Sequence, residues 1–179
     1  MKMISLLRGI NVSGQKKILM ADLKRLYEGL GFTQVTTYIQ SGNVVFETSD
    51  RRRKHLQNSI QSAIAAKYGF DVPVELRSRR DLQQVIANCP FAEVDLVAEG
   101  SRVAVVFLGD QPAASAVAKL AQHVHPPEKL VVMGREVYLH CPDGFGRTKL
   151  TNQMIEKKLG TVATARNWKT VLKLCELSG

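Results

Sequence analysis

The stretch VTTYIQSGNVVFE at residues 35–47 has the pattern of a β-hairpin. Residues 35–40 and 44–47 are rich in β-branched and aromatic side chains, which favour extended strands. Ser41-Gly42-Asn43 lies between them, and glycine and asparagine are the residues that a tight hairpin turn requires. The sequence therefore predicts two antiparallel strands joined by this turn.

The segments on either side of this hairpin complete a split β-α-β unit. A short apolar run at residues 3–7 predicts a buried strand, and apolar residues at helical spacing over 20–30 predict a helix that ends at Gly31. After the hairpin, residues 56–64 predict an amphipathic helix that ends at Gly69, followed by a strand at 72–76. The predicted order is β-α-β-β-α-β.

The same order is predicted a second time, after a bridging helix around residues 82–86. The second set of predicted elements is a strand at 103–108, a helix at 113–124, a hairpin at 130–140 around Gly134, a helix at 150–159 that ends at Gly160, a strand at 161–164 and a closing helix at 167–177. We therefore expect an α+β protein with two ferredoxin-like halves, each an antiparallel sheet backed by helices with an extra helix after it. The expected domains are residues 1–78, a bridging helix and loop at 79–101, and residues 102–179.

Composition narrows the class of protein. The 179 residues are 45% hydrophobic and 23% charged, which excludes disordered and collagen-like chains. The longest apolar run, residues 103–108, is too short to span a membrane, and residues 1–8 lack the pattern of an export signal, so we expect a cytoplasmic protein. Three cysteines without a C-x-x-C pair predict neither disulfides nor a thiolate zinc site.

The charge balance favours an anionic partner. Lysine and arginine number 25 against 16 acidic residues, a net charge of +9. Such a surplus suits a phosphate-containing ligand or a nucleic acid. Basic runs at residues 51–54 and 77–80 supply much of it; such a run is usually a solvated helix face, although it could also contact a nucleic-acid backbone without sequence preference. No zinc-finger spacing is present, and a helix-turn-helix does not fit so many strands.

Strand direction predicts which polar loops converge. In the first half the strand exit at residues 8–14 and the hairpin turn at 40–43 fall at one end of the sheet. In the second half the loops at 144–149 and 164–167 do the same. How the two halves dock is not specified by the sequence.

Four motifs resemble one known family. They are LLRGINV from Leu6, YIQSGNVVF from Tyr38, GFGRTKL from Gly144 and TARNWKTV from Thr164. Their order and spacing over nearly the whole chain are similar to those of domain-of-unknown-function family 1697, which is mostly bacterial. The resemblance implies paired ferredoxin-like halves, in agreement with the predicted elements, and brings no established activity with it.

The glycine-bearing loop at residues 9–14 does not form a nucleotide phosphate loop. Gln15 occupies the position where that motif has lysine, and no hydroxyl residue follows to bind magnesium, so an ATPase or GTPase is not predicted. Two interpretations stay open. The loop is an anion-binding nest, or it is a connector that uses glycine for positive φ.

The second pair of loops is the stronger candidate for anion binding. Arg147 and Lys149 flank the predicted start of one helix, and Arg166 precedes another that Asn167 can cap. Cations at a helix N-terminus oppose the macrodipole, and a bound anion would relieve that conflict. The alternative is that these cations pair with neighbouring carboxylates.

The candidate ligand-binding residues share a place in the converging loops; they are Arg8, Asn11, Lys16, Gln40, Asn43, Arg147, Lys149, Arg166 and Asn167. No catalytic residue is assigned, because His140 and Asp143 form too weak an acid–base pair to define a mechanism. The sequence predicts no metal and no cofactor. Three hypotheses remain: a binding module for an anionic partner, a small-molecule enzyme that uses the same loops, and motifs that are purely structural. The oligomeric state is left open.

Overall fold

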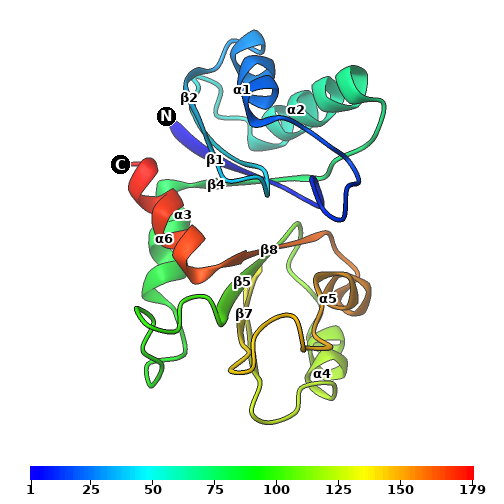
Figure 1. Cartoon of the computed structure of the whole chain (residues 1–179), viewed down its shortest axis with the longest axis vertical. Coiled ribbons are helices and arrows are strands. Elements are labelled where there is room, and N and C mark those ends of the chain that lie inside the picture. The colour runs from blue at the N-terminus through cyan, green and yellow to red at the C-terminus, as the bar shows by residue number, and fades with distance from the viewer. The chain divides into compact units, whose positions relative to one another are not determined.

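A computed structural model describes residues 1–179 of the chain (Figure 1). The chain folds into two compact units, each held together by its own internal contacts. The first unit is Met1–Gln83 together with Leu174–Gly179, and the second is Gln84–Lys173. Helices α3 (Arg79–Ala87) and α6 (Trp168–Leu177) each run from one unit into the other. Each unit is described on its own below.

The first unit is a four-stranded antiparallel sheet with two helices on one side. Its remaining elements are β1 (Lys2–Leu7), α1 (Met20–Gly29), β2 (Thr33–Tyr38), β3 (Asn43–Glu47), α2 (Arg53–Tyr68) and β4 (Val74–Ser78), and the strand order is β2-β3-β1-β4. Side chains alternate along β1, so that Met3 and Leu7 join the core beneath α1 and α2. Ser5 on the same face shares a hydrogen bond with the hydroxyl of Tyr27 at 2.6 Å, and burial raises the pKa of that phenol.

The second unit repeats this arrangement. Its elements are β5 (Val103–Leu108), α4 (Ala114–Ala121), β6 (Lys129–Met133), β7 (Glu136–His140), α5 (Asn152–Leu159) and β8 (Ala163–Asn167), and the strand order is β6-β7-β5-β8. The pairing register also agrees: Ile4 pairs with Val45 and Arg77 in the first sheet, as Val105 pairs with Tyr138 and Arg166 in the second. The predicted α+β fold with two similar halves is confirmed.

Local signals placed several element ends correctly. Gly69 and Gly160 follow α2 and α5 in the left-handed conformation, with φ of +74° and +69°. A glycine adopts this conformation without the steric cost that a Cβ imposes, which is why helices often end there. None of the helices combines the length and the apolar character needed to cross a membrane.

The last strand lies later in the chain than the predicted 161–164. Strand β8 covers Ala163–Asn167, and α6 begins at the next residue. The strand needs no connecting loop because Asn167, its last residue, also caps the helix: its Oδ1 accepts the backbone N–H of Thr170 at 2.8 Å. Arg166 is therefore a strand residue and not a loop residue.

The basic run at 77–80 is not uniformly solvated. Arg77 is 1% exposed in β4, and its Nη1 lies 3.3 Å from a carboxylate oxygen of Glu75. The next residue, Ser78, forms a reciprocal cap with Asp81, each side chain accepting the backbone N–H of the other. The run thus crosses from a strand into a helix, and only its later members are exposed.

Candidate functional site

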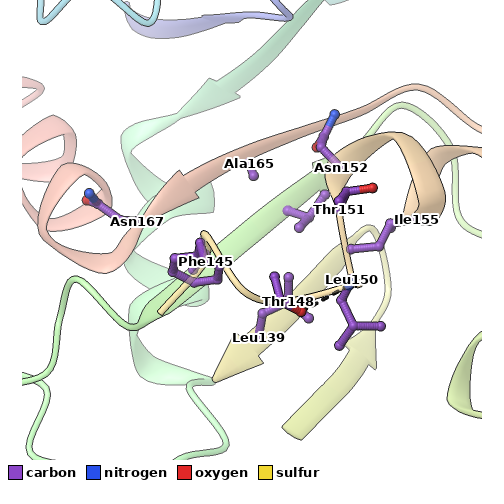
Figure 2. Close-up of a pocket in the computed structure, with 11 residues that line it drawn as sticks. Leu139, Phe145, Thr148, Leu150, Thr151, Asn152, Ile155, Ala165 and Asn167 are labelled. Atoms are coloured by element: carbon purple, nitrogen blue, oxygen red, sulfur yellow. Dashed lines mark hydrogen bonds between the residues drawn. The ribbon is translucent and has the colours of Figure 1, made fainter. Parts of the chain in front are cut away.

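A pocket of about 310 Å³ opens at the edge of the second core, on the side of the sheet that α4 and α5 cover (Figure 2). Strands β5, β7 and β8 supply its floor, and the loop before α5, together with the start of α5, supplies its wall. Its lining residues are Ala104, Val106, Leu139, Phe145, Thr148, Leu150, Thr151, Asn152, Ile155, Ala165 and Asn167. The lining thus combines an apolar floor with hydroxyl and amide groups.

The N-terminus of α5 lies in the wall of this pocket. Thr151 caps the helix, with its Oγ1 accepting the backbone N–H of Met154 at 3.2 Å. Thr148 performs a similar role for the preceding turn, since its Oγ1 accepts the N–H of Leu150 at 3.0 Å, the dashed line in Figure 2. In both residues the oxygen accepts one backbone N–H; the Thr148 hydroxyl also hydrogen-bonds with Cys141, which leaves the Thr151 hydroxyl proton as the group available for donation.

The N-terminus of α6 reaches the same pocket through Asn167, which lies on the far side of Phe145 from Thr151 and Asn152 in Figure 2. The cap uses the Oδ1 of Asn167 as an acceptor, in the same way as at Thr151. The pocket therefore lies at the first turn of α5, whose positive dipole end faces it, and the N-cap residue of α6 also lines it.

Asn152, the first residue of α5, ties the helix to β8. Its Nδ2 donates to the carbonyl of Ala163 at 2.6 Å, while its Oδ1 is buried and has no hydrogen-bond partner. Buried polar atoms are nearly always paired, so an unpaired one requires an explanation such as a bound molecule or a water.

The pocket lining carries no ionisable side chain. Two cations in the loop that leads to α5, Arg147 and Lys149, are each next in sequence to a lining residue, and both are exposed. The electrostatics of the pocket interior are therefore set by backbone dipoles and neutral donors, without a carboxylate to oppose an anion.

Arg166 does not line the pocket, although its neighbours Ala165 and Asn167 do. Successive side chains of a strand point to opposite faces, so Arg166 lies on the other face of the sheet, where it is 6% exposed. Its Nη1 donates to Thr164 Oγ1 at 2.9 Å and to the carbonyl of Ala165 at 2.8 Å. Burial lowers the pKa of the guanidinium to about 10.

In the first unit the two predicted loops do lie side by side, and Asn11 links them. Its Oδ1 accepts the N–H of Ile18 at 2.9 Å, and its Nδ2 donates to the carbonyls of Ile18 at 3.0 Å and Gln40 at 2.9 Å. The backbone adds a bond from the N–H of Leu7 to the carbonyl of Gly42 at 2.8 Å. The amide of Asn11 therefore holds the connection between the loops.

The other candidates of the first unit also make contacts within it. Asn43 is fully buried and donates to the Tyr38 carbonyl at 2.9 Å. The side chain of Lys16 donates to the Asp71 carbonyl at 2.6 Å. The backbone N–H of Arg8 donates to the Pro73 carbonyl at 2.9 Å. The side chain of Gln40 is exposed. Asn11, Lys16 and Asn43 thus make hydrogen bonds that hold the loops of the first unit together.

Nucleophilic and acid–base groups lie outside the pocket lining. Burial raises the pKa of the Cys141 thiol to about 11 and also raises that of Cys89, so neither is a thiolate near neutral pH. His140 is buried, with Nε2 3.7 Å from a carboxylate oxygen of Glu99 and with neither ring nitrogen hydrogen-bonded. No group of three or more histidine, cysteine, aspartate or glutamate side chains is arranged to hold a metal ion.

Of the nine sequence-predicted residues, Asn167 alone lines the pocket. Sequence reasoning missed Phe145, Thr148, Thr151 and Asn152. A signal for Thr151 was present, because threonine stands immediately before the apolar periodicity of α5, as an N-cap residue does. The hollow itself had no sequence signal, since it depends on how the loop before α5 packs on the sheet.

Comparisons with known proteins identify a family and a fold. The family model described as "Protein of unknown function (DUF1697)" matches residues 1–138. A solved structure with the same fold is that of the conserved bacterial protein SP0830 from Streptococcus pneumoniae, 23% identical, with a TM-score of 0.80 over 99% of this chain and 98% of that one. No curated protein matches the chain. Most of the pocket lies C-terminal to the residues that the family model matches.

Proposed function

The chain belongs to family DUF1697, whose description assigns no activity, so we infer its function from its own geometry. We propose that it binds a small anionic molecule in the pocket where α5 and α6 begin. The observation that carries this proposal is a hollow that no carboxylate lines, with the first turn of α5 and the N-cap residue of α6 in its lining. Helix N-termini attract anions through free N–H groups and the backbone dipole.

The capping pattern supports an acceptor-rich ligand. Thr151 and Asn167 each use a side-chain oxygen as an acceptor for the first turn of a helix. The hydroxyl proton of Thr151 and the amide protons of Asn167 then remain for other acceptors. The buried Oδ1 of Asn152 is an unpaired acceptor, so a water or an N–H or O–H group of the ligand, and not its anionic oxygens, would complete this part of the wall.

The shape of the site favours a small molecule over a nucleic acid. A pocket of about 310 Å³ lies at the lower end of the range typical of ligand sites. In the basic run at 51–54, Arg52 lies 3.0 Å from Asp50 and Arg53 lies 2.8 Å from Asp81, so part of its charge is already neutralised. A phosphate backbone would gain less there than the net charge of +9 suggests.

The same lining favours binding over catalysis. General acid–base chemistry needs a titratable side chain within hydrogen-bond reach of the substrate. The lining offers hydroxyls and amides and no titratable group. The enzyme hypothesis therefore finds less support here than the binding hypothesis.

A thermal-shift screen of the full chain tests the proposal. The probes are inorganic phosphate, a sugar phosphate, a nucleotide, aliphatic and aromatic carboxylates, and a short RNA. A molecule that binds the native state raises the melting temperature, by an amount that grows with its concentration above Kd. We expect at least one small anion to do so, and RNA to do so only at low salt, if at all.

A pair of matched variants locates the binding. Ala165→Phe fills the pocket from its floor, whereas Ala118→Phe places the same ring on the exposed surface of α4. The first variant is expected to abolish the anion-dependent shift, and the second to keep it. Equal shifts in both variants, or no shift with any anion in the unmodified chain, would refute the proposal.

A further inference from the structure

We infer that the anion is a monocarboxylate with an apolar body, an assignment that rests on the proposed binding function. It follows from two properties of the pocket that go beyond its preference for negative charge. One is the large apolar share of the lining, and the other is the amount of positive charge that the lining supplies.

The floor and most of the wall are hydrocarbon. The apolar lining residues are Ala104, Val106, Leu139, Phe145, Leu150, Ile155 and Ala165. An inorganic anion would occupy the polar end and leave this surface against water, whereas an aliphatic or aromatic body would cover it and gain the hydrophobic free energy. Phe145 in the loop before α5 is half-buried in the wall and presents a ring against which a ligand ring can pack.

The positive charge that the lining supplies is that of the N-terminus of α5. A helix N-terminus is equivalent to about half an elementary charge, which suits a ligand with a single negative charge. No lysine or arginine lines the pocket to supply more, and Arg147 and Lys149 are exposed to water. A phosphate monoester, which carries nearly two charges near neutral pH, would bring a second charge into the pocket without compensation.

A carboxylate matches both properties. It carries one charge, it accepts several hydrogen bonds in a plane, and its single substituent can lie on the apolar floor. A phosphodiester also carries one charge, but its two ester arms make a bulkier head for a pocket of about 310 Å³. The available donors are the hydroxyl of Thr151 and the first N–H groups of α5, those that precede the N–H of Met154, which donates to Thr151 Oγ1.

Isothermal titration calorimetry on the full chain at about pH 8 tests this assignment, with three probes that share a phenyl body. They are hydrocinnamate, its uncharged analogue hydrocinnamyl alcohol, and phenethyl phosphate, which is a dianion at that pH. We expect hydrocinnamate to bind about tenfold or more tightly than either of the others. This factor is what the interaction of one charge with a helix N-terminus contributes in a partly buried site. Ala165→Phe should remove this binding, and Ala118→Phe should retain it.

The outcomes separate this inference from the proposal beneath it. Tighter binding of phenethyl phosphate would overturn the monocarboxylate assignment and leave anion binding intact. Equal binding of the alcohol would overturn any role for the charge. If none of the probes and no anion of the thermal-shift screen binds, both the inference and the proposed function fail.

Discussion

Replacing Asn11 tests whether the first pair of loops has a structural role. Its side chain makes three hydrogen bonds that join the 8–14 loop to Ile18 and to the hairpin at Gln40, and its backbone has a φ of +55°. Each bond contributes about 1 kcal/mol net, and a Cβ-bearing residue other than asparagine adds about 1 kcal/mol of left-handed strain. Because the amide is only partly buried, we expect Asn11→Ala to lower the free energy of unfolding by about 3 kcal/mol.

Urea denaturation followed by circular dichroism measures this loss, with two controls. Asn11→Gly removes the same hydrogen bonds without the Cβ, so it should cost about 0.5–1 kcal/mol less than alanine. Gln40→Ala should cost less than about 0.5 kcal/mol, because only the backbone carbonyl of Gln40 takes part in the link. A loss below about 1 kcal/mol for Asn11→Ala, or a glycine variant less stable than the alanine variant, would refute this account of the loop.

Three other expectations concern single residues. Gly42→Ala should destabilise by about 2–3 kcal/mol in urea denaturation, since its Cβ would lie 2.7 Å from the nearest side-chain carbon at a φ of +80°; Gly134→Ala, with nothing closer than 3.9 Å, should cost about 1 kcal/mol. Asn167→Ala should cost about 1 kcal/mol through its lost helix cap, and Asn167→Ser should recover most of that in thermal melts. The Cys141 thiol, with its pKa raised to about 11, should react with iodoacetamide far more slowly in the native chain than in urea. The free energy of unfolding should fall as the pH rises from about 9 towards 11, because in that range the thiol ionises in the unfolded chain and not in the folded one. Native labelling as fast as in urea would contradict that burial.

The pocket changes how the basic composition of this chain is understood. The net charge of +9 points to a polyanion, yet the pocket that we propose as the anion site is lined by neutral groups. Backbone dipoles and capping side chains attract an anion without any lysine or arginine in contact with it. Arg77 and Arg166, which count towards the net charge, are buried in strands and bonded there.

The sequence by itself determined the features that depend on near neighbours. The hairpin around Gly42, the helices that end at Gly69 and Gly160, and the order of elements in each half follow from turn residues and apolar periodicity over a few positions. Strand direction then predicted which loops share a sheet end, and the bonds of Asn11 place the first pair together. These features are encoded locally because backbone conformation responds to the nearest side chains.

Tertiary structure alone decided which side chains are accessible and where a hollow is left. Strand β8 begins two residues and ends three residues later than predicted, which places Arg166 in a buried strand and not in a loop. The alternation of faces along the strand then puts Arg166 and Asn167 on opposite sides of the sheet. The pocket exists because strand β5, the loop between β7 and α5, and strand β8 pack together without filling the space between them. No local pattern encodes that space, since its volume is what remains after all the surrounding side chains have packed.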